Sequence, residues 1–578
     1  MTPDGETVRE FPDVGRRAGN REAGRAALET LLSDAALGDG GIRRFVPATA
    51  AAKVARGLAV RPRRVARHAR ALGTEFVQVA RGTSEVRPPK GDRRFSDPAW
   101  DTNWLLRRIM QGYLTVGSTA DELITEASVD WRSERQARFA IVNLVDALSP
   151  TNFPWSNPVV LREIINQGGA NLIRGARHFA HDVSSPSRLP ASVDTTKFDV
   201  GENLANTPGA VVLRTDVFEL IHYKPQTPRV YETPLLFVPP TINKYYILDL
   251  APGRSLIEHL VQAGQQVFAI SWRNPDAAQG HFDLDTYASA VLEATAAVAD
   301  VTAHSSVHIA AACSGGIISA GALAHLAADD RLSEVASLTL LVSALDNEQA
   351  GTASALTTRS VAAAAVAESA RKGYLDGQAL AGVFAWLRPN DLIWRYVINN
   401  YLLGKDPPAF DILYWNQDTV RLAAGLHRDF IRLALDNSLT RAGALSVLGT
   451  PVDLAAVDID TYVLAGLTDH IVPWENAYRG ARLFGGARRF VLSTSGHIQA
   501  LVNPPGPDSR ASFRVADADE AEPQDWLTAS PLHQGSWWTD YVAWLKARSG
   551  KRMPAAETLG STTHLAAAKA PGSYVHAT

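Results

Sequence analysis

Cysteine is almost absent from this chain of 578 residues: it occurs once, as Cys313, and methionine occurs three times. A single thiol cannot form an intramolecular disulfide or a metal site built from thiolates alone. The 15 histidines also lack the short spacings typical of zinc ligands, so we expect no bound metal. The low cysteine content favours a reducing, cytoplasmic setting.

Long apolar runs are missing as well. No segment reaches the roughly 18 to 20 apolar residues that a membrane helix needs, because charged residues or prolines interrupt each candidate. The start of the chain, MTPDGETVREFPDVGRR, is polar and lacks the apolar core of a secretory signal. These features predict a protein without a transmembrane segment.

Neither sign of charge is in large excess. Lys and Arg together number 57 and Asp and Glu number 60, which gives a net charge of −3. A nucleic-acid-binding protein usually carries a basic excess, so we expect no nucleic-acid partner. Hydrophobic residues make up 46% of the chain and charged residues 20%, which is typical of a globular protein with a large core.

The first 190 residues have helical patterns and divide near residue 94. Within residues 1–94, RPRRVARHARALGTEFVQVARG places Val65, Leu72 and Phe76 at helical spacing among arginines. This pattern predicts a basic amphipathic helix, and we expect it to pack on the domain rather than to bind a surface. The charged, Pro-rich stretch SEVRPPKGDRRFSDPAW indicates the boundary to a helical domain over residues 95–190.

From residue 191 onward, short apolar strands alternate with helices. Such alternation predicts an α/β fold with a largely parallel sheet covered on both faces. The strands are expected in TPLLFVPP, QQVFAISW, SVHIAAA, SLTLLVSAL, DTYVLAG and RRFVLST. Residues 191–346 are the first part of this domain, and residues 451–578 are its second part with a C-terminal tail.

A long interval, residues 347–450, breaks the alternation and is rich in Trp and Tyr. We interpret it as a helical cap over the carboxyl edge of the sheet, where open α/β sheets bind their ligands. A satellite module that only packs against the domain is the alternative.

The single cysteine lies between a predicted strand and a predicted helix, in HIAAACSGGIISA. A nucleophile at such a turn, with small residues two positions before and after it, is the nucleophile elbow of the α/β-hydrolase fold. Here those residues are Ala311, in place of the usual Gly, and Gly315. We therefore predict an α/β-hydrolase fold with Cys313 as nucleophile and the Ser314 N–H as an oxyanion donor. The alternative is that Cys313 is an ordinary small buried residue.

This fold requires an acid and then a histidine in the loops after later strands. Asp469 follows DTYVLAG and His497 follows RRFVLST, so both occur in the required order. Asp346, at the end of SLTLLVSAL, is a second candidate for the acid. Three further histidines are interpreted as packing or surface residues, namely His308, His325 and His470.

Cysteine suits acyl transfer from thioesters for a chemical reason. Attack of a thiolate on an acyl thioester gives another thioester of similar energy, so the acyl group stays activated. His497 would take the thiol proton, and Asp469 would orient the imidazole or help to activate an acceptor hydroxyl. The sequence therefore favours an acyltransferase, with a cysteine-dependent hydrolase, such as an acyl-CoA thioesterase or a dienelactone hydrolase, as the alternative.

Many segments contribute to a family resemblance, among them ACSGG, RPNDLIW, NNYLLG, PPAFDILYWNQDTVRLAAGLH, TDHIVPW, STSGHIQALVNPPG, SPTNFPWSNP, FVPPTINKYYILDL and SWRNP. Together they resemble the poly(3-hydroxyalkanoate) synthases, which make the polyester of bacterial storage granules. The details are most similar to the class that uses medium-chain monomers. The resemblance implies transfer of (R)-3-hydroxyacyl units from coenzyme A to a growing polyester chain, with no cofactor besides the coenzyme A of the substrate.

The resemblance also implies roles for particular residues. The family's nucleophile, acid and base fall on Cys313, Asp469 and His497. Other implied positions are Thr241 or Ile242 for the second oxyanion N–H, and Arg388 and Trp415 for substrate binding. The family's N-terminal region implies attachment to the granule surface and a homodimer, and hence a cytoplasmic location at that surface.

Overall fold

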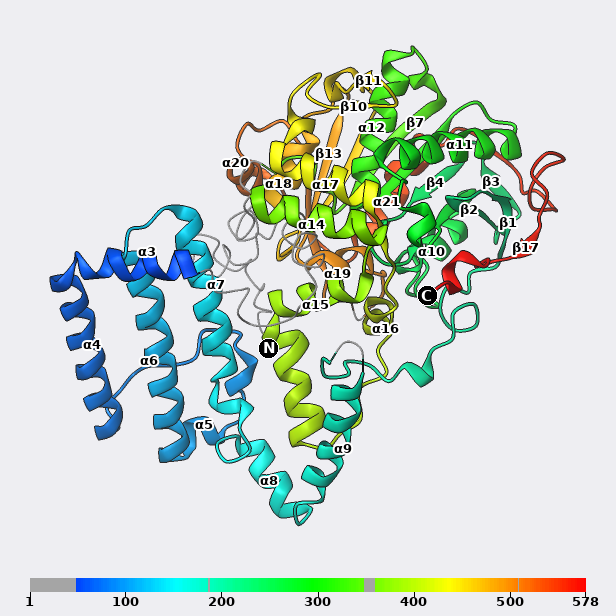
Figure 1. The fold of residues 1–578 in the computed structure, drawn as a ribbon. Coiled ribbons are helices and arrows are strands. Elements are labelled where there is room, and N and C mark those ends of the chain that lie inside the picture. Colours follow the sequence, from blue (N-terminus) through cyan, green and yellow to red (C-terminus); the bar gives the residue numbers. More distant parts are fainter. Residues whose placement is uncertain (1–47, 186–187, 348–358, 508) are drawn as a thin grey trace, which may run out of the picture.

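The computed structural model describes residues 48–578, except residues 186–187, 348–358 and 508. Residues 1–47 of the basic N-terminal region and residues 348–358 of the expected cap thus lie outside the described residues. Figure 1 shows a set of N-terminal helices, in blue and cyan, beside a larger α/β body.

The α/β body is built on an 11-stranded sheet with a parallel centre. The parallel strands, in order across the sheet, are β13 (Arg488–Ser493), β12 (Thr461–Gly466), β7 (Val335–Leu341), β6 (Val307–Ala312), β4 (Leu235–Val238) and β5 (Val267–Trp272). Each overlaps one of the six stretches predicted as strands. The prediction of an α/β fold with a largely parallel sheet is confirmed, because strands buried on both faces have continuous apolar runs.

Antiparallel strands extend the sheet at both edges, and the sequence patterns did not predict them. They are β14 (Ser512–Asp517) and β15 (Leu532–Gln534) beyond β13, and β2 (Phe218–Tyr223), β1 (Gly209–Arg214) and β17 (Ala568–Lys569) beyond β5. A two-stranded sheet pairs β3 (Arg229–Tyr231) with β16 (Arg552–Pro554).

Helices cover both faces of the sheet, with a hydrophobic core on each. One core includes α11 (Leu284–Thr302), α12 (Ser314–Ala328), α18 (Trp474–Ala481) and α20 (Pro523–Ala529). The other includes α10 (Leu256–Gln262), α19 (His497–Leu501) and α21 (Trp537–Lys546). Successive side chains of β4 point into opposite cores, Leu236 into the first and Phe237 into the second, because neighbouring side chains of a strand lie on opposite faces of the sheet.

The insertion between β7 and β12 is mainly helical, as expected. Its helices are α14 (Arg359–Lys372), α15 (Gly377–Leu387), the π-helical turns η9 (Asn390–Trp394) and η10 (Val397–Leu402), α16 (Asp411–Gln417) and α17 (Ala424–Asp436). Two short pairs accompany them, β8 (Tyr374–Leu375) with β9 (Leu422–Ala423) and β10 (Ser446–Val447) with β11 (Thr450–Pro451). Helix α17 packs into the same core as α11 and α12, so part of the insertion belongs to the body.

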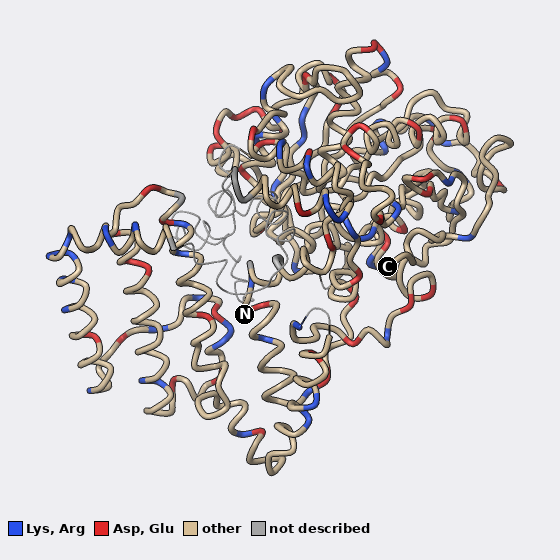
Figure 2. The backbone as a smooth tube through the Cα atoms, viewed as in Figure 1, with Lys and Arg blue, Asp and Glu red and all other residues tan. Residues whose placement is uncertain are grey.

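The N-terminal helices form one unit that crosses the boundary near residue 94. They are α3 (Ala48–Ala59), α4 (Pro62–Arg81), α5 (Ala99–Thr102), α6 (Trp104–Glu126), α7 (Trp131–Ala147), α8 (Pro158–Asn166) and α9 (Ala170–Ser184). Helix α4 packs against α6, and α3 packs against α7. Basic residues on α3 and α4, blue in Figure 2, pair with acidic residues of this unit: Arg64 and Arg67 with Glu126, and Lys53 with Asp130.

Helix α9 connects this unit to the insertion. A Cβ on Gly175 would lie 1.8 Å from the Tyr401 carbonyl oxygen, so only glycine permits this approach. The Asn171 amide donates to the Leu402 carbonyl at 2.8 Å, and the Tyr401 hydroxyl donates to Asp182 at 2.9 Å. The helical unit and η10 are therefore fixed to each other.

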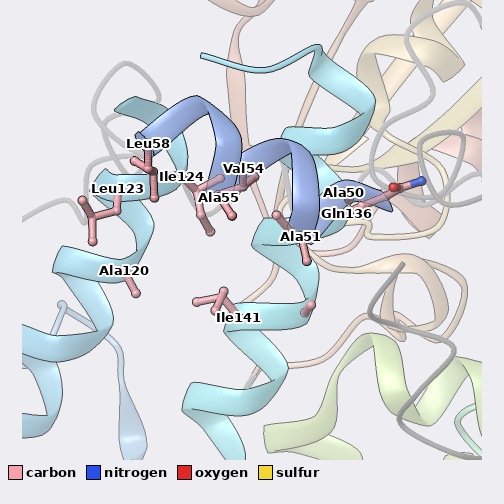
Figure 3. A pocket seen from close by; sticks show the side chains of 12 residues that line it. Ala50, Ala51, Val54, Ala55, Leu58, Ala120, Leu123, Ile124, Gln136 and Ile141 are labelled. Atoms are coloured by element: carbon pink, nitrogen blue, oxygen red, sulfur yellow. The ribbon is translucent and has the colours of Figure 1, made fainter. Parts of the chain in front are cut away.

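An apolar cavity of about 340 Å³ lies between α3, α6 and α7 (Figure 3). Its lining includes Val54, Leu58, Leu123 and Ile141, and Gln136 is its polar member. None of the described helices is both long and apolar enough to cross a bilayer.

Candidate active site

Cys313 occupies the turn between β6 and α12 in a strained conformation. Its φ is +50° and its ψ is −117°, a region that non-glycine residues rarely adopt. The Cys313 N–H donates to the Leu341 carbonyl of β7 at 2.9 Å, and the Gly316 N–H donates back to the Cys313 carbonyl at 3.0 Å. These contacts hold the nucleophile at the tip of the turn, as the elbow pattern predicts.

The small residues around Cys313 are required by close backbone contacts. A Cβ on Gly315 would lie 2.4 Å from the Val238 carbonyl oxygen, and a Cβ on Gly316 would lie 2.2 Å from Ser343 Oγ. Ala311, which replaces the usual first glycine, is fully buried and pairs in register with Val238. The alanine therefore fits within the strand.

Asp469 and His497 form a buried pair at the carboxyl ends of β12 and β13. His497 Nδ1 lies 2.6 Å from Asp469 Oδ2, and both side chains are almost fully buried. The second carboxylate oxygen, Asp469 Oδ1, accepts the N–H groups of Ile471 at 2.8 Å and Val472 at 2.9 Å. The carboxylate is therefore fixed, and it orients the imidazole with Nδ1 toward the acid.

The electrostatics of this pair increase the proton affinity of His497. Burial alone would lower the pKa of His497, but the charge and hydrogen bond of Asp469, together with the interaction with Cys313, raise the pKa above its ordinary value. Cys313 is therefore close enough to His497 to contribute to this shift of its pKa. The structure thus brings together all three residues predicted for the triad.

The competing acid is engaged elsewhere. Asp346 accepts from Asn437 Nδ2 at 2.9 Å and pairs with Arg479 Nε at 3.1 Å, so it holds α18 and the end of α17 rather than a histidine of the site. The geometry selects Asp469 over Asp346 as the partner of His497.

The other histidines occupy different environments. His308 lies within β6 and contacts Ser337 Oγ at 2.7 Å, and burial lowers its pKa to about 4. His325 Nδ1 contacts Thr450 Oγ1 at 2.7 Å. His470 adjoins the site: burial lowers its pKa to about 4, and its Nδ1 has no hydrogen-bond partner within the described part of the chain.

The oxyanion prediction requires one correction. The Thr241 N–H donates to Ser314 Oγ at 2.9 Å, so it is already occupied and cannot face a substrate. The neighbouring Ile242 N–H has no acceptor among the described residues, which leaves it as the candidate donor from this loop. Ser314 begins the 15-residue helix α12, so its own N–H lies at the positive end of a helix, as predicted.

The two residues assigned to substrate binding lie in the insertion. Arg388 is exposed and pairs with Asp391. The charges of both act on the pKa of His470, which lies beside the catalytic pair. Trp415 is 4% exposed, and its Nε1–H donates to the Lys244 carbonyl at 2.7 Å. Trp415 is therefore a buried contact between α16 and the loop that follows β4, and its role toward substrate stays a prediction.

The sequence patterns missed the polar contacts that join this loop to the insertion. Lys244 Nζ lies 2.6 Å from Asp418 Oδ1, and the Tyr246 hydroxyl donates to Asp418 Oδ2 at 2.7 Å. Lys244 and Asp418 stand in two of the stretches that carry the family resemblance, but no local pattern indicates that they meet. Among the described residues, no group of three or more His, Cys, Asp or Glu side chains is placed to hold a metal ion.

Comparison with known protein families matches two parts of the chain. Residues 91–260 match the family model described as the N-terminus of poly-beta-hydroxybutyrate polymerase, PhaC. Residues 235–504 match the model of the alpha/beta hydrolase fold, which agrees with the fold predicted from the cysteine elbow. The solved monoacylglycerol lipase of Paleococcus ferrophilus is 13% identical and covers 57% of this chain and 99% of its own, with a TM-score of 0.30.

Curated proteins match almost the whole chain. Poly(3-hydroxyalkanoate) polymerase 1 of Ectopseudomonas oleovorans is 42% identical over 93% of this chain and 95% of its own length. Polymerase 2 of the same organism is 42% identical over 89% of this chain and 91% of its own. The PhaC subunit of the Cupriavidus necator poly(3-hydroxyalkanoate) polymerase is 40% identical over 86% of this chain and 85% of its own.

Proposed function

Because the chain belongs to the family of poly(3-hydroxyalkanoate) polymerases, which are acyltransferases, we propose that it polymerises (R)-3-hydroxyacyl units from coenzyme A through a thioester on Cys313. The observation that carries the mechanism is the buried Asp469–His497 pair beside the cysteine elbow. A histidine of raised pKa, held by a fixed carboxylate, is suited to activating a thiol.

The first half-reaction loads the enzyme. His497 takes the proton of the Cys313 thiol, and the thiolate attacks the carbonyl carbon of the hydroxyacyl thioester. The negative charge on the carbonyl oxygen is stabilised by the N–H groups of Ser314 and Ile242. The carbon–sulfur bond to coenzyme A then breaks, and the leaving thiolate takes the proton from His497.

The second half-reaction extends the chain. The 3-hydroxyl of another hydroxyacyl unit gives its proton to His497, and its oxygen attacks the thioester carbonyl on Cys313. An oxygen ester forms, the carbon–sulfur bond to Cys313 breaks, and the thiol regains a proton from His497. Asp469 keeps the imidazole in the tautomer that both steps need.

Water is the competitor in the second step. Hydrolysis of the acyl-cysteine would release 3-hydroxy acid, which is the outcome expected of the alternative function, a cysteine-dependent hydrolase. Arg388 and Asp391 of the insertion lie close enough to His470 for their charges to act on it, and this supports a cap over the site. A cap that limits the access of water favours polymer over free acid.

The same proposal includes partners and location. Large exposed hydrophobic side chains are frequent in the N-terminal part of the described chain, among them Trp104, Trp131, Trp155, Ile165 and Phe179. Exposed apolar side chains of this size support attachment to a polyester granule in the cytoplasm and a homodimer there. The choice of a medium-chain substrate follows from the sequence resemblance described above.

Product analysis tests the proposal. The protein is incubated with (R)-3-hydroxydecanoyl-CoA while free thiol is followed, and the products are then separated by mass. Thiol release with high-mass polyester is expected, whereas thiol release with free 3-hydroxydecanoic acid alone would support the hydrolase. His497→Gln should abolish thiol release, and His325→Gln is the matched control that should retain it.

A further inference from the structure

The loop that carries the candidate oxyanion donor includes one residue in the left-handed conformation. We call residues 239–244, which follow β4, the oxyanion loop. Asn243, next to Ile242, has a φ of +65°, a left-handed conformation that asparagine adopts more readily than most residues. The contacts of this loop with the rest of the fold decide whether the Ile242 N–H keeps its position.

Two of those contacts come from the insertion and meet at one residue. The Lys244 ammonium is 5% exposed and pairs with Asp418 at 2.6 Å, and the Lys244 carbonyl accepts from the Trp415 indole at 2.7 Å. Trp415 lies in α16, and Asp418 follows the last residue of that helix. The C-terminal end of α16 thus contacts Lys244 twice, at its carbonyl oxygen and at its ammonium group.

Breaking this ion pair carries a large penalty, because the buried Lys244 ammonium loses its partner in a poorly solvated site, while Asp418 is 17% exposed. Asp418 also accepts a hydrogen bond from the Tyr246 hydroxyl at 2.7 Å. Its carboxylate therefore contacts both Lys244, the last residue of the oxyanion loop, and Tyr246, two residues later. Movement of α16 away from the body would release this end of the loop, next to Ile242 and Asn243.

We propose that the Lys244–Asp418 ion pair is a latch that positions the oxyanion loop, so that Ile242 faces the reacting carbonyl only while α16 is seated. This inference rests on the proposed function. Lys244 and Asp418 are positioning residues, since they act through Ile242. The latch makes acyl transfer depend on a closed cap. While the cap is open to water, the oxyanion of a reacting thioester receives little stabilisation.

The test compares two reactions of Cys313, which is the only thiol in the chain. Acylation by (R)-3-hydroxydecanoyl-CoA passes through an oxyanion, and the first turnover is measured as coenzyme A released. Alkylation by iodoacetamide forms a carbon–sulfur bond with loss of iodide and has no oxyanion. Both reactions need the thiolate and access to the site, so at saturating (R)-3-hydroxydecanoyl-CoA their ratio reports on the step that passes through the oxyanion.

In Lys244→Met we expect acylation to slow by about 10- to 100-fold, below the loss caused by removing an oxyanion donor outright. Alkylation should change by no more than about twofold. Asp418→Asn, which keeps the shape of the side chain and can still accept from Tyr246, is measured beside it and should show the same selective loss. The double variant Lys244→Met/Asp418→Leu leaves no buried charge unpaired, yet its acylation should stay slow.

Arg254→Met is the matched control. Arg254 pairs with Asp411 at the start of α16, so it also ties this helix to the body but does not touch the oxyanion loop. In Arg254→Met, the rates of acylation and of alkylation should both stay within about twofold of those of the parent protein.

Three results would overturn the latch: unchanged acylation in Lys244→Met, equal slowing of acylation and alkylation, or full recovery of acylation in the double variant. Failure of the unmodified protein to release coenzyme A would count against the proposed function instead.

Discussion

Replacing Asp469 by Asn tests the geometry of the site with a change of one atom. Asp469 Oδ1 accepts two backbone N–H groups, from Ile471 and Val472, and Oδ2 faces His497 Nδ1. The amide oxygen of Asn must take the place of Oδ1, because an NH₂ group cannot accept those hydrogen bonds. The NH₂ group then faces His497 Nδ1 and donates to it.

This donation reverses the tautomer of the histidine. Nδ1 becomes an acceptor, so the ring proton moves to Nε2, where His497 can no longer take the proton of Cys313. The loss expected for the wrong tautomer is about 10⁴-fold in kcat. That corresponds to about 5 kcal/mol of transition-state stabilisation, at 1.36 kcal/mol for each factor of ten.

Initial rates of coenzyme A release give kcat and KM, and a thermal melt reports whether the variant is folded. We expect a large fall in kcat with little change in KM, since substrate binding does not use Asp469. Asp346→Asn is the control: it loosens the contact with Arg479 and should lower the melting temperature while turnover is retained. Retention of more than about a tenth of kcat in Asp469→Asn would refute the tautomer argument.

Three further predictions concern the elbow, pH and the helical unit. Gly315→Ala places a Cβ 2.4 Å from the Val238 carbonyl, and urea unfolding should show a loss of about 1–3 kcal/mol; an unchanged midpoint would contradict the contact. The pKa of His497 is raised from 6.5 to about 10, so its pair with Asp469 stabilises the fold fully below pH 6.5 and loses that contribution as pH rises toward 10. The stability difference between the parent protein and His497→Gln should shrink over that range, and a difference that grows with pH would contradict the shift. Gly175→Ala should loosen α9 from Tyr401 and speed proteolysis between the helical unit and the body, whereas unchanged cleavage would show that the contact does not fix them.

The parallel strands could be predicted because burial on both faces leaves a continuous apolar run. Strand β2 has no such run, since its sequence FELIHY contains Glu219 and His222. Glu219 is fully buried because Arg214, Ser573 and the Tyr574 N–H satisfy its carboxylate. The partners from residues 573 and 574 come from the far end of the chain, so no local pattern could indicate that this strand is buried.

The candidate triad could be predicted because the fold fixes the order and the strand that each member follows. Local patterns could not decide between Asp469 and Asp346, because both residues follow a predicted strand. Their hydrogen bonds separate them, since one carboxylate faces His497 and the other faces Arg479. The occupied N–H of Thr241 could not be foreseen either, since it depends on where the Ser314 hydroxyl points.

The central claim is that the acyl group is carried on Cys313. The most direct measurement is mass spectrometry of the protein after brief reaction with (R)-3-hydroxydecanoyl-CoA and an acid quench, followed by digestion to locate the adduct. We predict hydroxydecanoyl units on the peptide that contains Cys313, and neither adduct nor turnover in Cys313→Ala. Turnover by Cys313→Ala, or an adduct on another peptide, would contradict the mechanism.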